Sequence, residues 1–355
     1  MSQIHPETQS DDYHRPSGLL SRSLQTLNKT KLFLIQLSFI VSYIDKVQIY
    51  TVKTTSHSAI KLLSSWLNFN GIINCSICLY FILKRKSFSK FVDYFDKEIA
   101  NYSKNDHIRK FIAKNRIITN MYFPFFFILY FTYAIYDVYI FYRESEPYDK
   151  LAFRVFRNLF RSTIHLNHLV LMQFIVESCL HVQICFKMVL DQLECLKRAD
   201  GLLKIEKLQP IRQLYDIAAE KTRKLDSLLF MILCAYYCGC LQVYEINFAG
   251  LINNYSYIRL LVIVRETLIL IYITFHVANI NRLANGAFNK VYSISYKAHS
   301  LAIITEIRYF LIRIGRNDVG LTLLKIVLIT PSFVTSILTL SLTIALSIPS
   351  IFTKT

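Results

Sequence analysis

Ionisable and tyrosine side chains stand inside the longest apolar stretches of this 355-residue chain. Charge in a hydrocarbon environment is costly, so such residues usually face a cavity, water or a partner. A few placed polar groups among aromatic walls are typical of a small-molecule pocket. The alternative is a structural ion-pair network without a ligand, for example Glu245 with Arg265. The residues that we expect to bind a ligand are Asp137, His165, His168, Tyr237, Tyr244, Glu245, Arg265 and Glu266.

Histidine spacing raises the alternative of a membrane metalloenzyme. His165 and His168 are three residues apart, and Glu177 and His181 are four apart, so each pair shares one face of a helix. A metal-dependent membrane enzyme needs such clusters on several helices, and His276 alone does not complete a set. No phosphate-binding glycine loop or nucleophile motif is present. The sequence therefore predicts no metal, no cofactor and no enzymatic activity.

A stripe of hydroxyl residues marks the last apolar stretch, residues 321–350. Thr330 followed by Pro331 predicts a helix start, with a hydroxyl N-cap and proline at the first helical position. From Ser332 the hydroxyl residues recur every three or four positions and so share one helix face. Such a stripe lines a wet pathway or forms a tight helix contact, and both alternatives stay open. The candidate pore-lining residues are Ser336, Thr339, Thr343, Ile344 and Ser347, with Leu338, Ile344 or Ile348 as an apolar constriction.

Seven stretches are long and apolar enough to position these residues across a bilayer. The composition, 53% apolar with 14% aromatic residues, excludes a disordered or fibrous chain. The sequence therefore predicts an all-α integral membrane protein with seven transmembrane helices. The predicted spans are residues 32–50, 62–83, 117–141, 163–189, 227–249, 258–280 and 326–348.

The distribution of basic residues predicts how these spans are oriented. Of the 41 Lys and Arg residues, 28 fall on one side when the connecting segments alternate, and 8 fall on the other. The basic side is the cytoplasm by the positive-inside rule, so the N-terminus is cytoplasmic and the C-terminus extracellular. This orientation places the candidate ligand residues toward the outer half, in a pocket open to the outside. It is opposite to that of a G-protein-coupled receptor, and it explains the net charge of +17 without nucleic acid.

Helical patterns continue beyond several spans and predict cytoplasmic helical extensions. The apolar pattern of span four continues to Leu196, and residues 303–314 form a separate amphipathic pattern. We therefore expect a cytoplasmic tail over 1–30, transmembrane helices 1–6 with a cytoplasmic helical bundle over 31–320, and a final pore-type helix with a short extracellular tail over 321–355.

All eight cysteines lie in spans or on the predicted cytoplasmic side. No external disulfide framework is therefore expected. Cys75 and Cys78, and the group from Cys234 to Cys240, have spacings known from metal and redox sites. Within apolar helices, packing as small hydrophobic residues is the favoured interpretation.

Seven spans, the inverted orientation and an amphipathic segment that leads into a short final span resemble the insect gustatory receptor family. The most specific likeness is in residues 281–350, which resemble the family's helix before the pore and the pore helix itself. The family signature there is Thr-Tyr, five hydrophobic residues and Gln-Phe. The matching positions read Thr343-Ile344, then residues 345–349, then Ser350-Ile351. Thr343 matches and Pro349 departs from the pattern, which is typical of a divergent member.

The resemblance implies a chemosensory function. Members of this superfamily are ligand-gated cation channels of the plasma membrane, built as tetramers in which each subunit gives its last helix to a central pore. It implies a small-molecule ligand, contact with membrane lipids, and a homo- or hetero-tetramer joined through the cytoplasmic helices and the last span. The alternative that we keep is a non-conducting binding or scaffold subunit, or a carrier, of the same architecture.

Overall fold

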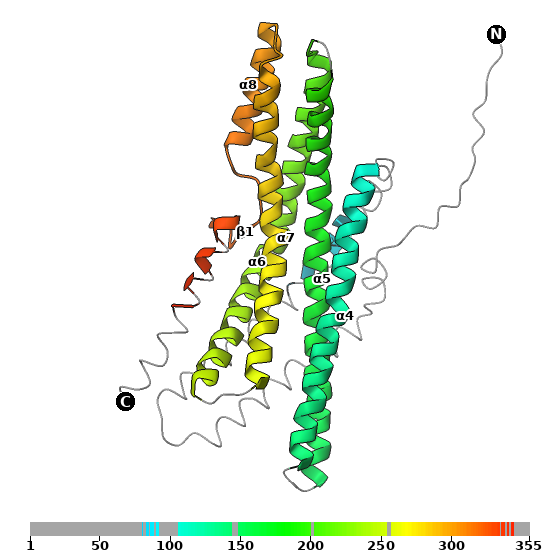
Figure 1. Ribbon diagram of the computed structural model, residues 1–355, viewed down its shortest axis with the longest axis vertical. Coiled ribbons are helices and arrows are strands. Elements are labelled where there is room, and N and C mark those ends of the chain that lie inside the picture. The colour runs from blue at the N-terminus through cyan, green and yellow to red at the C-terminus, as the bar shows by residue number, and fades with distance from the viewer. Residues whose placement is uncertain are drawn as a thin grey trace, which may run out of the picture.

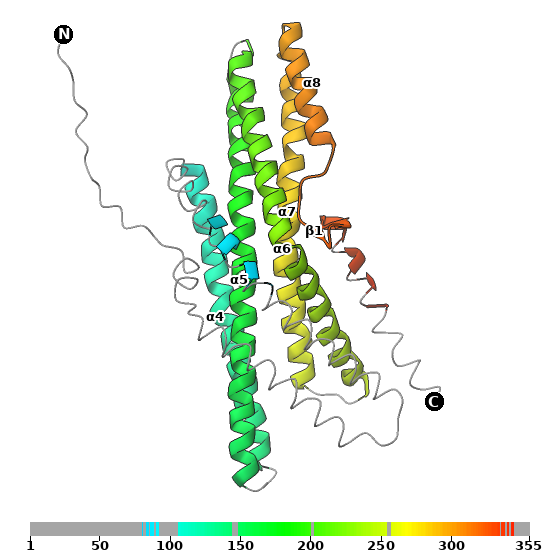
Figure 2. The same ribbon diagram turned by 180° about the vertical axis from the view of Figure 1, so that it is seen from behind.

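The computed structural model describes residues 106–143, 148–199, 202–253 and 257–333, with single positions or short pieces of 80–91 and 335–343. The described residues are almost entirely helical. Figure 1 shows an elongated bundle in which the long helices run along the longest axis, and Figure 2 shows the same arrangement from behind. The helices are α4 (Asp106–Arg143), α5 (Tyr148–Arg198), α6 (Ile205–Asn253), α7 (Tyr257–Ser295) and α8 (Leu301–Gly315).

The predicted spans three to six are helices that extend well beyond their apolar stretches. α4 begins eleven residues before residue 117, and α5 begins at Tyr148, fifteen residues before residue 163. The continuation of span four to Leu196 is confirmed, because α5 ends at Arg198. Spans one and two and the tail over 1–30 lie outside the described residues, apart from single positions between 80 and 91.

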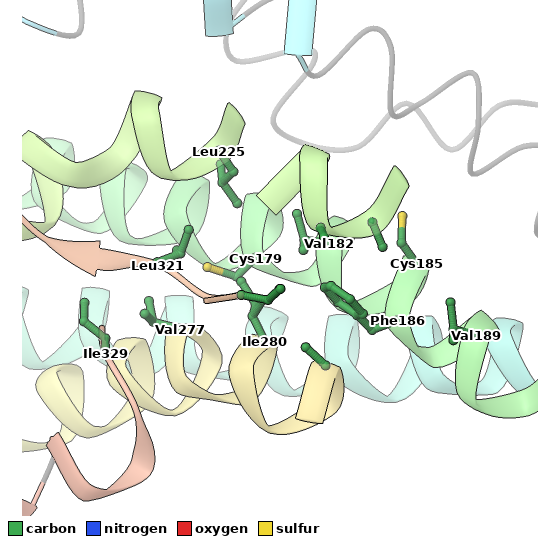
Figure 3. Packing of buried hydrophobic residues seen from close by; sticks show 14 of the residues in the cluster. Cys179, Val182, Cys185, Phe186, Val189, Leu225, Val277, Ile280, Leu321 and Ile329 are labelled. Atoms are coloured by element: carbon green, nitrogen blue, oxygen red, sulfur yellow. The ribbon is translucent and has the colours of Figure 1, made fainter. Parts of the chain in front are cut away.

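Helix α5 is the centre of the bundle and packs against α4, α6 and α7. Its buried face includes Cys179, Val182, Phe186 and Val189, spaced three or four residues apart. Figure 3 shows this face toward residues of α6 and α7, including Leu225 and Val277. Burying a side chain of this size stabilises the fold by about 1.5–3 kcal/mol relative to leaving it exposed. The packing of this α5 face on α6 and α7 therefore stabilises the bundle.

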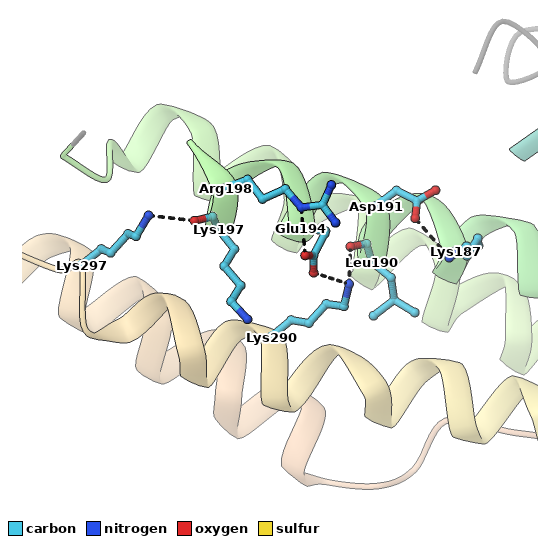
Figure 4. A network of polar contacts seen from close by, with 8 residues as sticks. All are labelled: Lys187, Leu190, Asp191, Glu194, Lys197, Arg198, Lys290 and Lys297. Carbon is cyan, nitrogen blue, oxygen red and sulfur yellow. Dashed lines mark hydrogen bonds and ion pairs between the residues drawn. The ribbon is translucent and has the colours of Figure 1, made fainter. Parts of the chain in front are cut away.

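Two lysine side chains, one on α7 and one just after it, contact the end of α5, as Figure 4 shows. Lys290 Nζ donates to the backbone oxygen of Leu190 at 3.2 Å and pairs with Glu194 at 2.9 Å. Lys297 Nζ donates to the backbone oxygens of Lys197 and Ala199 at 2.7 and 3.0 Å. The last carbonyls of a helix lack partners within it, and a cation there also interacts favourably with the helix dipole. These contacts therefore hold α5 and α7 in register.

The amphipathic pattern over 303–314 is confirmed as α8. Ser300 caps its first turn by accepting a hydrogen bond from the backbone of Ile303, and the buried side chains are Ile303, Ile307, Phe310 and Ile314. Phe310 meets the ring of Tyr215 on α6 edge-on at 5.5 Å, and Tyr215 meets Phe186 of α5 in the same way. Burial raises the pKa of Tyr215 to about 12. This ring chain attaches α8 to the bundle.

Ion pairs add a second link between α6 and α8. Arg212 pairs with Glu306 at 2.5 Å, and Arg313 pairs with Asp216 at 3.3 Å and with Asp318 at 2.8 Å. Although burial opposes it, the hydrogen bond and charge of Arg313 hold the pKa of Asp318 below its usual range. The segment after α8 is therefore fastened to the same face of the bundle as α8 itself.

A β-hairpin precedes the final helix, where the sequence predicts the start of span seven at residue 326. Strands β1 (Thr322–Leu323) and β2 (Val327–Leu328) pair antiparallel, so this part of the prediction is wrong. Apolar content made the hairpin look like helix, because a hydropathy window does not distinguish the two. Leu324 and Lys325 have φ of 53° and 60° in the turn, a conformation that costs non-glycine residues energy.

The predicted helix start after the hairpin is confirmed. Helical residues begin at Pro331, and Thr330 Oγ1 accepts a hydrogen bond from the backbone of Phe333 at 3.3 Å. The described helical positions continue, with gaps, to Thr343. The final helix therefore begins directly beside the hairpin, and the hairpin connects it to α8.

Candidate functional site

The predicted ligand residues lie on four helices. Asp137 is on α4, His165 and His168 are on α5, and Tyr244 and Glu245 are on α6, but their side chains lie outside the described residues. The side chains of Tyr237, Arg265 and Glu266 are described, and all three are buried. The pair on α7 therefore lies inside the bundle, and ligand binding by these residues stays a prediction.

Arg265 and Glu266 form a buried ion pair between sequence neighbours on α7. Arg265 Nε donates to Glu266 Oε1 at 3.0 Å, and a second guanidinium nitrogen contacts the same oxygen. The buried thiol of Cys240 on α6 lies beside Glu266. Removing one partner of such a pair leaves an uncompensated buried charge, which is strongly destabilising. Because the two charges compensate each other, the pair places polar atoms between α6 and α7 without adding net charge.

Tyr237 joins three elements at one point. Its hydroxyl donates to Thr274 Oγ1 of α7 at 2.9 Å, and its ring meets Phe333 of the final helix edge-on at 6.2 Å. Phe333 and Ile337 are the partly buried residues through which the final helix packs on the core of the bundle. A group that displaces the Tyr237 ring would therefore act directly on the first turn of the final helix.

A buried amide network between α5 and α7 was not predicted from the sequence. Gln183 Nε2 donates to the backbone oxygen of His276 at 2.7 Å, and Asn279 Nδ2 donates to Gln183 Oε1 at 3.1 Å. The Gln183 side chain is fully buried. Amides inside apolar helices are a usable signal, since they need partners there. Their pairing partners, 93 and 96 residues away, could not be read from spacing.

The hydroxyl stripe of the final helix is exposed. Ser336 and Thr339 donate to the backbone oxygens four residues earlier at 3.1 and 2.9 Å, and Thr343 does the same at 2.9 Å. A hydroxyl that donates to its own helix presents its oxygen outward as an acceptor. Ile344 and Ser347 lie outside the described residues. The described part of the stripe thus forms a row of acceptor oxygens that the bundle does not cover.

The hairpin ties the base of this helix to α6. Asp226 accepts from the backbone nitrogen of Thr322 at 2.6 Å and from its hydroxyl at 2.9 Å. Lys325 Nζ lies 4.9 Å from the centroid of the Phe230 ring, at cation–π distance. Gly320 leads into the hairpin, and a Cβ there would lie 2.8 Å from Leu328. The hairpin is therefore a close-packed joint between α8, α6 and the final helix.

Within the described residues, no three His, Cys, Asp or Glu side chains gather closely enough to hold a metal ion. The six cysteines of this part of the chain are free thiols. Cys179, Cys185 and Cys240 are buried, as expected for packing residues.

Two stretches of the described helices are long and apolar enough to cross a membrane, Leu171–Arg198 and Leu260–Ser295. They belong to α5 and α7, in the regions of predicted spans four and six. Most of the first stretch is buried inside the protein, whereas about half of the second is buried.

Comparisons with known proteins give one consistent result. No family model and no curated protein matches the chain. Among solved structures, the chain is similar to the olfactory receptor OR5 of the insect Machilis hrabei in complex with eugenol. The TM-score is 0.62 at 12% identity, over 89% of this chain and 88% of that chain. The same receptor without a named ligand gives a TM-score of 0.55 at 14% identity, over 89% and 87% of the two chains.

The fold is that of an insect olfactory receptor. At this low identity the likeness concerns the fold alone, but it covers nearly the whole of both chains. The expected all-α fold is thus supported, while the resemblance to gustatory receptors still rests on the sequence, most specifically on residues 281–350.

Proposed function

We propose that this chain is a gustatory-receptor-like chemosensory receptor that acts as a ligand-gated cation channel in the plasma membrane. The observation that carries the proposal is the final helix, which packs on the bundle through its first turns and leaves its hydroxyl stripe exposed. The olfactory-receptor fold gives this arrangement a functional setting. Seven spans with a cytoplasmic N-terminus and an extracellular C-terminus are part of the proposal.

An exposed apolar band on α4 supports the membrane placement. It extends from residue 117 to residue 139, which is about 33 Å at 1.5 Å per residue. The hydrocarbon core of a bilayer is about 30 Å thick. A band of this size would be unfavourable in water and is well suited to lipid. Its exposed members are Ile117, Ile118, Met121, Phe125, Phe127, Ile128, Phe131, Ile135, Tyr136 and Tyr139.

Exposed apolar side chains on the opposite half of the bundle support assembly into a homo- or hetero-tetramer. They lie on the last turn of α7, just after it and on α8, beyond the length that a bilayer would cover. An apolar patch exposed outside a membrane is typical of a protein interface. These residues are Tyr292, Tyr296, Leu301, Ile304, Tyr309 and Ile312. A tetramer in this arrangement would bring four final helices to one axis.

Acceptor oxygens on the final helix support a cation pathway. Hydroxyl protons of Ser336, Thr339 and Thr343 are used within the helix, so the outward oxygens carry partial negative charge. Apolar side chains near Ile344 would gate such a path by excluding water, and the hydroxyls would keep the open path hydrated.

We propose that Tyr237 couples ligand binding to the position of the final helix. The solved olfactory receptor is in complex with eugenol, a small molecule. A small molecule bound among Asp137, His165, His168, Tyr237, Tyr244, Glu245, Arg265 and Glu266 would contact the Tyr237 ring or its neighbours. Because Tyr237 touches Phe333, two positions of this ring would give two positions of the final helix. A ligand that prefers the open arrangement shifts the gate by its differential affinity for the two states.

The competing function is a non-conducting binding or scaffold subunit, or a carrier, of the same fold. Whole-cell currents from the singly expressed chain, screened against small-molecule mixtures, separate the two. Ligand-dependent cation currents support the channel. Surface expression with ligand binding but without current, also after co-expression with related subunits, contradicts it.

A further inference from the structure

Basic side chains form a collar directly beside the apolar band of α4. Lys110 and Lys114 lie one helical turn apart and are exposed, and Ile117 and Ile118 follow on the same face one turn later. The helix face therefore changes from cationic to apolar within about 5 Å along its axis. The opposite face is packed, since Ile112 is buried against α5.

A second set of lysines lies at nearly the same level. Lys84, Lys86 and Lys90 are exposed, and Phe88 between them is fully buried, with its ring 4.9 Å from that of Phe174 on α5. Phe174 is six residues from Leu180, which shares a cluster with Ile112. Six residues of helix rise only about 9 Å. The two sets of lysines are thus separated by only about 9 Å along the bundle axis, a distance that long lysine side chains can span.

Within the described part of the chain, these five lysines have no acidic partner. The neighbouring Arg109, in contrast, forms an ion pair with Asp106 at 2.9 Å. A cluster of unpaired, exposed cations next to a lipid-facing surface has a charge opposite to that of anionic phospholipid headgroups. Long lysine side chains also reach naturally from an apolar surface to a headgroup.

We propose that this collar, formed by Lys84, Lys86, Lys90, Lys110 and Lys114, binds anionic phospholipid headgroups of the cytoplasmic leaflet. The proposal rests on the membrane placement in the proposed function, and it adds a specific lipid to it. Headgroups bound there would stabilise the contact of Phe88 with α5, because the lysines on both sides of Phe88 would contact the same layer of headgroups.

The test is a thermal-shift titration of the full-length chain in a neutral detergent. Short-chain phosphatidylserine is compared with short-chain phosphatidylcholine and with inorganic phosphate. We expect phosphatidylserine to stabilise the protein at lower concentration than phosphatidylcholine, and the difference to shrink at high salt. The double variant K110Q/K114Q should raise the half-saturating concentration of phosphatidylserine about fivefold or more.

Matched controls make the outcomes decisive. K204Q/K207Q removes two exposed lysines at the start of α6, away from the band, and should leave the titration unchanged. K110R/K114R keeps the charge and should behave as wild type. The proposal is overturned if K110Q/K114Q has the same half-saturating concentration of phosphatidylserine as wild type, or if K204Q/K207Q raises this concentration by as much.

The alternative occupants give separate results. Stabilisation by inorganic phosphate at the same concentration would assign the collar to free phosphate, and stabilisation by an acidic peptide but not by phosphatidylserine would assign it to a protein partner. Either result overturns the lipid proposal. A full-length chain that stays dispersed in buffer without detergent would instead contradict the membrane placement, and so the proposed function itself.

Discussion

Asp226 is the residue whose removal should loosen the final helix from the bundle. Its carboxylate accepts from the backbone and the hydroxyl of Thr322, the first residue of the hairpin. A hydrogen bond to a charged group contributes about 1.5–3 kcal/mol. Burial raises the pKa of Asp226, although the Thr322 hydrogen bonds and Lys325 oppose this shift. Part of the gain is therefore offset by desolvation of the carboxylate.

The expected net cost of Asp226→Ala is about 2–3 kcal/mol, because two such bonds are lost and the desolvation cost is recovered. For a chain of this size, this corresponds to a fall in melting temperature of roughly 5 °C. The assay is thermal unfolding of the detergent-solubilised chain, followed by size-exclusion chromatography. In the channel, the same variant should change the ligand concentration for half-maximal current, since the hairpin no longer holds the final helix to α6.

Glu220→Ala is the matched control on the same helix. Glu220 pairs with Lys224 at 2.8 Å on the exposed surface of α6, so its removal should leave the melting temperature unchanged. A melting temperature for Asp226→Ala that equals the control and wild type would refute the reasoning that the hairpin is held by this carboxylate. Thr322→Val, which keeps the backbone donor, should show an intermediate loss.

Three further predictions concern the bundle. Tyr237→Phe keeps the contact with Phe333 but leaves the Thr274 hydroxyl without its donor, so ligand-evoked currents should shift in sensitivity while surface expression stays normal; unchanged dose–response curves would contradict a coupling role. Gln183→Leu should lower the free energy of unfolding by about 1–3 kcal/mol, and with it the melting temperature, because Asn279 loses its buried acceptor; a melting temperature equal to wild type would contradict this. Asp318 has a lowered pKa in the folded state, so the ionised carboxylate stabilises the fold at any pH above the pKa of the unfolded state. This stabilisation is lost as the pH falls below about 4. The difference in melting temperature between wild type and Asp318→Asn should therefore vanish on acidification, and a constant difference would contradict it.

Much of the architecture could be predicted because it follows helical periodicity. The α8 pattern and the start at Thr330 and Pro331 depend only on local spacing and capping, and both are confirmed. The extension of α5 to Arg198 followed from an unbroken apolar pattern. Local signals of this kind need no knowledge of partners.

The remaining features depend on contacts between distant segments. The hairpin was missed because its residues are as apolar as a membrane helix, and what bends the chain there is packing against Asp226 and the absence of a side chain at Gly320. Arg265 and Glu266 were expected to face a cavity or a partner, but their pairing with each other follows from side-chain geometry that spacing does not give. All eight predicted ligand residues stay predictions, and the side chains of five of them, including Asp137 and Glu245, lie outside the described residues.

The most direct test of the pore assignment is cysteine accessibility in the final helix during current recording. Thr343→Cys places a thiol of similar size on the hydroxyl stripe, and Leu342→Cys places one on another exposed face of the same helix. A pore lined by the stripe predicts that a charged methanethiosulfonate reagent reduces the ligand-evoked current of Thr343→Cys, while wild type and Leu342→Cys are unaffected. Ligand-evoked currents of Thr343→Cys that do not respond to the reagent, or an equal response of Leu342→Cys, would contradict a pore lined by the hydroxyl stripe.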